Sequence, residues 1–316
     1  MVTKVFIDGA SGTTGLEIRE RLAKRRELEL PLLDDTRRKD PSARADALNS
    51  ADVVILCLPD DAAREAVRLI TNPQVKVLDP STAHRVADGW VFGFPELEPK
   101  RRDELRQAMR VTNPGCYSTG FLAAVRPLVR AGLVPADWPV LCNAVSGYSG
   151  GGKAMIAEFE DESAPNHTST VFRTYALTLE HKHVDEMQKH AGLKQRPLFA
   201  PSVGRFYRGM LVEIPLPLSA LPGRPTVKQI HAALADSYRG ERLIEVASLE
   251  DAASRKTLDA EELKDTNRLK LYVFGNEARG QARVVAVLDN LGKGAAGASV
   301  QNLNIMMGSP ETEGLI

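Results

Sequence analysis

The reactive chemistry of this chain centres on one cysteine, Cys116. It follows an Asn-Pro-Gly turn at residues 113–115 and precedes apolar residues at helical spacing, so we expect it at the start of a helix. The unpaired N–H groups and positive dipole end of a helix N-terminus stabilise a thiolate. A cysteine in that place is suited to be a nucleophile. The alternative is a buried cysteine that acts as a small apolar side chain.

A second group of reactive side chains lies at residues 180–186, where His181 and His183 precede Glu186. In a helix, His183 and Glu186 lie three positions apart on one face and can form a hydrogen bond. A carboxylate on one imidazole nitrogen fixes the tautomer and raises the basicity of the other nitrogen, as a general acid–base requires. Two solvated surface histidines are the alternative. A metal site is disfavoured because the two histidines have no third ligand at suitable spacing.

Two further features are suited to binding anionic groups of a substrate. Residues 146–153 contain Ser146, several glycines and the cation Lys153 directly before a predicted helix, which suits a phosphate. Arg208 stands at the mouth of an alternating strand, where a guanidinium can hold a carboxylate through two hydrogen bonds. The alternatives are a flexible surface loop and an exposed edge arginine.

The first third of the chain predicts a dinucleotide-binding site. A short apolar strand at residues 5–7 leads through a glycine-rich turn into a helical pattern. Glycines at this place allow a tight turn and a close approach of backbone to a pyrophosphate, which then rests on the helix N-terminus. An ordinary glycine-rich turn is the alternative. The predicted phosphate-loop residues are Gly9, Ser11, Gly12, Thr13 and Gly15.

The coenzyme preference depends on residues 34–39. An acidic residue there favours NAD by accepting hydrogen bonds from the ribose, whereas arginines accept the 2′-phosphate of NADP. Both are present, and Arg37 and Arg38 favour NADP(H), with a solvated charged loop as the alternative. Ser81 follows a strand predicted at residues 75–79, at the sheet edge where such folds bind ligands, and is a further candidate coenzyme contact.

The element pattern predicts an α/β protein of two domains. Strands at 52–59 and 75–79, with a helix at 61–70 between them, predict a Rossmann domain over residues 1–112. Residues 113–293 mix helices and strands without regular alternation, which predicts an α+β catalytic domain with a mainly antiparallel sheet. The C-terminal helix is expected to return to the Rossmann domain, so that residues 294–316 pack on it. Other expected elements are helices at 100–109, 227–238 and 259–264, strands at 140–145, 269–274 and 282–287, and a turn that enters an alternating strand at 205–214.

Composition argues against several classes of protein. The 41 basic and 41 acidic residues cancel, which gives no electrostatic footprint for nucleic acid or an anionic membrane. No apolar run approaches the ~20 residues of a membrane-spanning helix. The N-terminus shows no signal-peptide pattern, and three cysteines suit a reducing compartment. We therefore expect a cytoplasmic protein that binds neither nucleic acid nor membranes.

Taken together, the motifs resemble those of the N-acetyl-γ-glutamyl-phosphate reductases, the arginine-biosynthesis branch of the semialdehyde dehydrogenase group, and the length is similar to their short class. The matching segments occur in family order across nearly the whole chain. Lysine stands between the two histidines where arginine is common, and residues 34–39 do not align with the family's 2′-phosphate contact. The matching segments are residues 9–15, 113–117, 146–153, 181–186 and 289–297.

The resemblance implies an activity and a set of roles. Cys116 would be the nucleophile, His183 with Glu186 its acid–base partner, and Arg208 a ligand of the substrate α-carboxylate. Asn290 would contact the coenzyme. The implied reaction is NADPH-dependent reduction of N-acetyl-L-glutamyl 5-phosphate to the 5-semialdehyde and inorganic phosphate, through a cysteine thioester. The implied partners are the small acyl phosphate, phosphate and further copies of the chain in a dimer or tetramer.

Three other functions remain open at this point. Another semialdehyde dehydrogenase, acting on aspartyl phosphate or on a carrier-linked glutamyl phosphate, shares every catalytic element. A dinucleotide-sensing or scaffold protein would use the cysteine only structurally. A metal-dependent hydrolase is the third, and its activity would be sensitive to chelators.

Overall fold

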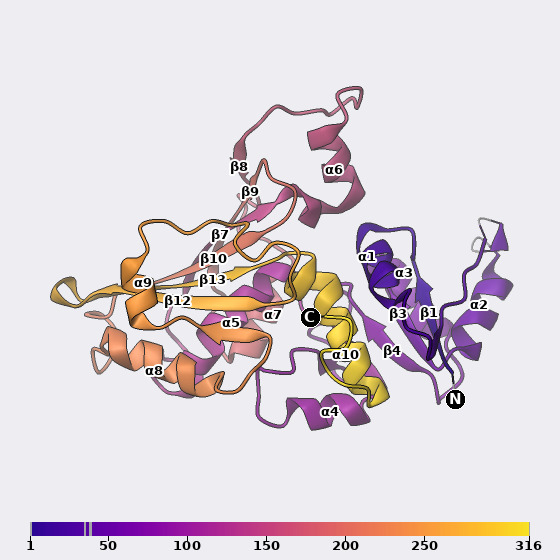
Figure 1. Cartoon of the computed structure of the whole chain (residues 1–316), viewed down its shortest axis with the longest axis horizontal. Coiled ribbons are helices and arrows are strands. Elements are labelled where there is room, and N and C mark those ends of the chain that lie inside the picture. The colour runs from indigo at the N-terminus through magenta and orange to yellow at the C-terminus, as the bar shows by residue number, and fades with distance from the viewer. Residues whose placement is uncertain (1, 35, 38–39, 316) are drawn as a thin grey trace. The chain divides into compact units, whose positions relative to one another are not determined.

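The computed structural model describes residues 2–34, 36–37 and 40–315, and the chain divides into two compact units (Figure 1). Unit 1 comprises Met1–Pro114 and Ala295–Ile316, and unit 2 comprises Gly115–Gly294. Unit 1 is therefore built from two separate stretches of sequence, and unit 2 from one. Among the described residues, no helix is both long and apolar enough to span a membrane.

Unit 1 is organised around a parallel sheet with the strand order β2-β1-β3-β4-β6-β5. Every ladder described in it is parallel. The continuous apolar sequence of β3 fits this architecture, because a central parallel strand is buried on both faces. The strands are β1 (Thr3–Asp8), β2 (Leu28–Glu29), β3 (Val53–Leu56), β4 (Lys76–Asp79), β5 (Val91–Phe92) and β6 (Arg110–Thr112).

Helices cover both faces of this sheet. On one face, α2 and α3 bury Leu48 and Ala66 against Val54 and Val77 of the strands. The C-terminal helix α10 contacts α1, α4 and β4, and Lys76 Nζ of β4 donates to the Met306 carbonyl at the end of α10 (2.6 Å). A cation in the last turn satisfies a helix carbonyl that has no partner within the helix. The helices are α1 (Thr13–Leu22), α2 (Pro41–Ser50), α3 (Asp60–Leu69), α4 (Arg101–Gln107) and α10 (Gly297–Met307).

Unit 2 contains a mixed sheet with the strand order β11-β12-β13-β10-β7-β9-β8. The pairs β10–β13, β10–β7, β12–β13 and β8–β9 are antiparallel, whereas β7–β9 and β11–β12 are parallel. The unit is thus α+β with both kinds of ladder. The strands are β7 (Leu141–Gly147), β8 (Phe172–Thr174), β9 (Leu198–Gly204), β10 (Met210–Leu216), β11 (Ile244–Val246), β12 (Leu269–Asn276) and β13 (Gln281–Leu288).

Helix α5 packs on the middle of this sheet and sets the position of the candidate site. It contacts β10 and β13, and it also contacts α7 and α8. A Cβ on Gly120 would lie 2.7 Å from Val212 Cγ2, so only glycine allows this close approach of helix to sheet. The helices of unit 2 are α5 (Cys116–Arg130), α6 (Gly152–Glu160), α7 (Val184–Ala191), α8 (Val227–Ser237) and α9 (Leu249–Ser254).

The helix predicted at residues 259–264 is wrong, because residues 260–265 form successive turns. The Asp259 carboxylate accepts a hydrogen bond from the Glu261 N–H (2.9 Å), and Asp265 adopts a positive φ of 64°. A side chain that bonds to the backbone two residues on offers the chain an alternative to helix. Conversely, α2 is a helix that the hydrophobic pattern did not predict.

Candidate active site

Cys116 is the first residue of α5, as its sequence context predicts. The N-cap residue, Gly115, is extended (φ −75°, ψ 153°), and the first turn of the helix contains no acidic residue. The cysteine is partly buried. A Cβ on Gly294 would lie 2.8 Å from Cys116 Cβ, so the backbone of Gly294 passes directly beside this side chain. The thiol therefore occupies the positive end of a fifteen-residue helix dipole.

His183 and Glu186 lie at the start of α7. His183 is the N-cap residue, and Glu186 is in the first turn. Their residues are only 5% and 1% exposed, so His183 is not a solvated surface histidine. Lys182, which separates the two histidines, is exposed. An outward lysine leaves the arrangement of the buried histidine unchanged.

Hydrogen bonds join the starts of the two helices. The Gly115 N–H donates to Glu186 Oε2 (3.2 Å), and the Ser118 hydroxyl donates to the His183 carbonyl (3.4 Å). Glu186 thereby satisfies an amide at the N-terminus of α5, next to the cysteine. These bonds bring Cys116, His183 and Glu186, which the sequence predicted as catalytic, into one site within unit 2.

Aromatic rings enclose the histidines. The ring centroids of His181 and His183 are 4.7 Å apart, and that of Tyr117 is 5.9 Å from His183. His181 Nδ1 accepts a hydrogen bond from the His183 N–H (3.1 Å), which restrains the backbone at His183. Burial raises the pKa of the nearby Tyr175 to about 12. Nothing in the local sequence pattern around Tyr175 marks it as part of the site.

Arg208 is held by two carboxylates. Its Nε lies 2.8 Å from Asp289 Oδ2, and its NH1 donates to Asp265 Oδ1 (2.9 Å). The Arg208 side chain is 11% exposed, and that of Asp289 is fully buried. Arg208 is therefore not an exposed edge arginine. Its guanidinium joins the start of β10 to the segment after β13 through the buried Asp289, and to the segment before β12 through the exposed Asp265.

Three other predicted residues lie in unit 2 in different settings. The Asn290 Oδ1 accepts from the Gly209 N–H (2.8 Å), and its Nδ2 donates to Ser149 Oγ (2.9 Å). Both ends of this amide thus hold loops of unit 2 together. The Ser146 hydroxyl is buried and donates to the Gly147 carbonyl (3.1 Å). Lys153 is exposed in the first turn of α6.

In unit 1, the predicted phosphate loop has the shape that requires glycine. Gly9 has φ +87°, and a Cβ there would lie 2.2 Å from the Cys57 carbonyl oxygen. A Cβ on Gly15 would lie 2.4 Å from the Gly9 carbonyl oxygen. Gly12 is the N-cap of α1, and the Thr13 hydroxyl is buried with no hydrogen-bond partner among the described residues. A close-lying backbone at a helix start and an unused hydroxyl fit the diphosphate of a dinucleotide.

A cavity of about 500 Å³ opens beside this loop. It lies at the carboxyl end of β1, next to β3, where the connections of a doubly wound sheet diverge and ligands bind. Its lining includes Gly9 and Ser11 of the loop. Ser81 and Arg37 do not line it, and the Ser81 hydroxyl donates to Asp79 Oδ2 (2.9 Å). Arg38 lies outside the described residues.

The described part of the chain contains no group of three or more His, Cys, Asp or Glu side chains placed to hold a metal ion. Cys57 and Cys142 are free thiols whose pKa is raised by burial. A raised pKa keeps a thiol protonated and unreactive at neutral pH. The two cysteines thus differ from Cys116, which stands at a helix start.

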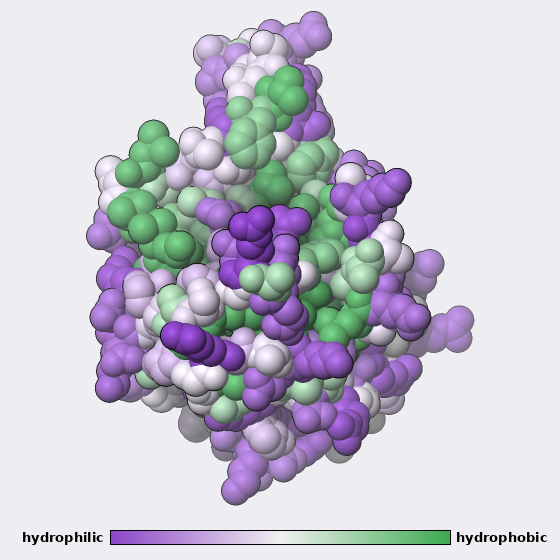
Figure 2. All heavy atoms as spheres, turned by 90° about the vertical axis from the view of Figure 1, so that its left-hand side faces the viewer, coloured by the Kyte–Doolittle hydropathy of each residue, from purple (hydrophilic) through white to green (hydrophobic). Residues whose placement is uncertain are grey.

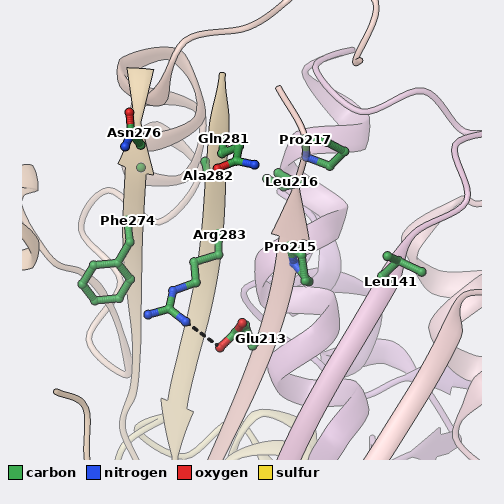
Figure 3. A pocket seen from close by; sticks show the side chains of 11 residues that line it. Leu141, Glu213, Pro215, Leu216, Pro217, Phe274, Asn276, Gln281, Ala282 and Arg283 are labelled. Atoms are coloured by element: carbon green, nitrogen blue, oxygen red, sulfur yellow. Dashed lines mark hydrogen bonds and ion pairs between the residues drawn. The ribbon is translucent and has the colours of Figure 1, made fainter. Parts of the chain in front are cut away.

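A second cavity, of about 570 Å³, lies on the face of the unit 2 sheet opposite α5 (Figure 3). Leu141, Pro215 and Phe274 contribute apolar walls, and Arg283 pairs with Glu213 across it (3.3 Å). None of the predicted site residues lines this cavity. Figure 2 views the molecule from the side of α8 and α9 and shows apolar residues gathered in patches among hydrophilic ones.

Comparisons with known proteins agree with this architecture. The model of the semialdehyde dehydrogenase dimerisation domain matches residues 116–290, and that of the semialdehyde dehydrogenase NAD-binding domain matches residues 34–107. Among solved structures, aspartate semialdehyde dehydrogenase II of Vibrio cholerae, complexed with ASA, superposes with a TM-score of 0.72 at 16% identity, covering 97% of this chain and 98% of that chain. The aspartate semialdehyde dehydrogenase of Candida albicans with NADP gives 0.64, also at 16% identity, covering 97% and 99%. These likenesses show the fold.

Curated relatives are much closer in sequence. The N-acetyl-gamma-glutamyl-phosphate reductase of Brucella anthropi is 52% identical over 98% of this chain and 99% of its own length. N-acetyl-gamma-glutamyl-phosphate reductase 2 of Nostoc sp. strain PCC 7120 is 52% identical over 99% of both chains. The chain therefore belongs to the N-acetyl-γ-glutamyl-phosphate reductases, oxidoreductases of the semialdehyde dehydrogenase family.

Proposed function

We propose that this chain is a cytoplasmic enzyme of arginine biosynthesis. It reduces N-acetyl-L-glutamyl 5-phosphate to N-acetyl-L-glutamate 5-semialdehyde and phosphate, with NADPH as reductant. The names of the close relatives support the substrate. The observation that carries the proposal is the pair of hydrogen bonds that joins the start of α5, where Cys116 lies, to the start of α7, where His183 and Glu186 lie.

Cys116 begins the reaction as a nucleophile. Its thiolate attacks the acyl carbon, a C–S bond forms, and the C–O bond to the phosphate breaks with the electron pair leaving on phosphate. The product on the protein is a thioester, so that one difficult step is divided in two. The dipole of α5 favours the ionised sulfur required for this attack.

When bound in unit 1, the coenzyme supplies the hydride that reduces the thioester carbon. His183 then acts as the general acid and base. It donates to the carbonyl oxygen as negative charge develops there, and it takes the proton back when the C–S bond breaks and the aldehyde leaves. The hydrogen bond to His181 restrains the backbone of His183, and neighbouring rings pack beside its imidazole, which suits a group that must meet the same oxygen twice.

The remaining predicted residues bind the substrate in this proposal. Arg208 recognises the α-carboxylate, because a guanidinium matches the geometry of a carboxylate. The loop at 146–153 receives the phosphate. It presents backbone N–H groups at the start of α6, and Lys153 supplies a counter-charge that is exposed and engaged with no other described residue.

The decisive experiment compares two cysteine variants. We expect Cys116→Ser to lose NADPH oxidation with N-acetylglutamyl phosphate, measured at saturating substrate. Cys142→Ser, at a buried thiol, is the matched control and should keep the activity within a few-fold. Mass spectrometry without NADPH should show the acyl adduct on the wild type and on the control only. Near wild-type turnover by Cys116→Ser would overturn the nucleophile assignment.

The rival substrate is tested in parallel. Aspartyl phosphate is offered to the wild type at the same concentrations, and kcat/KM is compared for the two acyl phosphates. The proposal requires a higher value for the N-acetylated substrate. An equal or higher value for aspartyl phosphate would assign the chain to the other branch of the family.

We also infer that the chain forms a homo-oligomer, a dimer or tetramer, through the face of the unit 2 sheet opposite α5. The family model that matches residues 116–290 is a dimerisation domain, and Leu141 on that face is 43% exposed. Leu141→Glu should lower the mass measured by sedimentation velocity. Val86→Glu in unit 1, at a residue that is 39% exposed, is the control and should leave it unchanged. A wild type that sediments as a monomer would contradict the inference.

A further inference from the structure

The cavity in unit 1 is lined by two arginines that lie outside the predicted phosphate loop and outside residues 34–39. Arg19 comes from α1, and Arg44 comes from α2. A single carboxylate, Asp8 at the end of β1, is the other charged residue among the described lining. These three side chains give the described lining a formal charge of +1.

Arg44 neutralises Asp8. Its Nε donates to Asp8 Oδ2 at 2.9 Å, and the two side chains are only 15% and 13% exposed. A second carboxylate, Glu65, lies 3.4 Å from Arg44 NH1. Because Asp8 directly precedes the phosphate loop, an unpaired charge there would repel the phosphates of a nucleotide. The ion pair removes that repulsion and also engages Arg44.

Arg19 is in a different state. It is exposed, and no carboxylate among the described residues pairs with it. On the same helix, Glu17 pairs with Arg21 (3.5 Å) and not with Arg19. Arg19 therefore contributes the uncompensated positive charge of the cavity.

Of the two acidic residues at 34–39 that would favour a free ribose, Asp34 is engaged elsewhere, and Asp35 lies outside the described residues. Asp34, after β2, accepts hydrogen bonds at one oxygen from the Thr36 N–H (3.0 Å) and the Arg37 N–H (2.8 Å). It does not line the cavity, whereas the apolar Leu32 and Leu33 before it do. Among the described lining residues, no unpaired carboxylate is left to bind ribose hydroxyls or to repel a phosphate attached to them.

We propose that Arg19 binds the 2′-phosphate of NADP and makes the cavity selective for the phosphorylated coenzyme. Arg44, by pairing with Asp8, keeps the Asp8 carboxylate from repelling the bound phosphates. This inference rests on the proposed function, since it takes NADP(H) as the coenzyme. It assigns the selectivity to residues on α1 and α2, in place of Arg37, which does not line the cavity.

Two nucleotides that differ only in the 2′-phosphate test it directly. Adenosine 2′,5′-bisphosphate and adenosine 5′-monophosphate are titrated into the full-length protein by calorimetry. The wild type should bind the bisphosphate at least about tenfold more tightly, the value of one charge-assisted contact. Arg19→Gln should remove about that factor and leave the monophosphate affinity within about twofold.

Arg37→Gln is the matched control, because Arg37 is exposed in the same unit and does not line the cavity. Arg37→Gln should keep the wild-type ratio of the affinities for the bisphosphate and the monophosphate. A ratio unchanged in Arg19→Gln, or a ratio that collapses in Arg37→Gln, would overturn the assignment. So would a wild type that binds both nucleotides equally.

Arg44 is tested by a pair of variants. Arg44→Gln should weaken the bisphosphate more than the monophosphate, because it exposes the ligand to the Asp8 charge. Adding Asp8→Asn should restore most of the lost affinity for the bisphosphate. Thermal melting checks that each variant is folded. Failure of that rescue would refute the role given to Arg44. Turnover of N-acetylglutamyl phosphate is measured separately, so a wild type that prefers the bisphosphate but reduces no substrate would refute the proposed function alone.

Discussion

The two candidate sites of this chain are built on opposite principles. In unit 2, buried side chains of α5 and α7 are fixed by hydrogen bonds between elements distant in sequence, as between Gly115 and Glu186. In unit 1, the phosphate loop depends on missing side chains, because a Cβ at Gly9 would overlap the Cys57 carbonyl. A reacting group must be held in one place, whereas a large cofactor needs backbone that it can approach. The variants below should therefore fail differently in the two units.

The largest effect is expected at His183. His183→Asn should lower kcat by about 10²–10⁴-fold, the usual contribution of a general acid–base. NADPH binding, measured by fluorescence, should be unchanged, because the residue lies in unit 2. Lys182→Gln, at the exposed neighbour, is the control and should keep full activity. A smaller loss in which the pH–rate profile is unchanged would remove His183 from the mechanism.

The next effect is expected at Gly9. Gly9→Ala should weaken NADPH binding by more than about tenfold and lower stability by roughly 1–3 kcal/mol, since alanine meets both a clash and a positive φ. Gly89→Ala separates the two causes, because Gly89 also has a positive φ (+79°) but faces open space. Gly89→Ala should lower stability through backbone strain and leave NADPH binding unchanged. Alkylation of Cys116 by iodoacetamide should be as fast in both variants as in the wild type.

A smaller change is expected at Glu186. In Glu186→Gln the side-chain carbonyl can still accept from the Gly115 N–H, so stability should change little. In Glu186→Ala a buried N–H loses its partner, at about 1–3 kcal/mol. Urea unfolding measures this difference, and kcat for Glu186→Gln reports the role of the negative charge alone. Equal stability of the two variants would show that this hydrogen bond does not hold α5. Asp185→Asn, on the exposed side, should resemble the wild type.

The smallest effect concerns pH. Burial raises the pKa of Tyr175 to about 12, above its ordinary value. The folded protein therefore keeps this proton where the unfolded chain releases it, and the free energy of unfolding falls as pH rises from about 10 to 12. Tyr175→Phe should make that fall shallower, as measured by urea unfolding across the same range. If the free energy of unfolding fell equally with pH in the variant and the wild type, the Tyr175 hydroxyl would have to be solvated.

Much of the fold follows from local pattern, and the exceptions have local reasons. The apolar run of β3 and the glycine turn before α1 predicted the parallel sheet of unit 1. Helix α2 was missed because it buries only Ala43 and Leu48, too few for a visible periodicity. Its start was nevertheless marked, since the Asp40 side chain accepts from the Ser42 N–H (2.9 Å) and Pro41 is the first helical residue.

The site was less accessible to sequence reasoning, because its partners are far apart along the chain. The position of Cys116 followed from the turn and helix beside it. The contacts of Arg208 with Asp265 and Asp289 did not, because nothing near residue 208 indicates which carboxylates reach it. Asn290 likewise could not be connected to Gly209 in advance. Chemical types are visible in a sequence, whereas long-range pairing is decided by the tertiary structure.

Unit 1 is completed by the last twenty-two residues of the chain, Ala295–Ile316. During synthesis these residues emerge from the ribosome only after Gly115–Gly294, so α10 reaches the parallel sheet after the strands of that sheet and the whole of unit 2 have been made. The uninterrupted stretch Gly115–Gly294 can mature earlier. A stop codon introduced just before Ala295 would accordingly leave the parallel sheet without α10 and prone to degradation, while sparing the segment that carries Cys116.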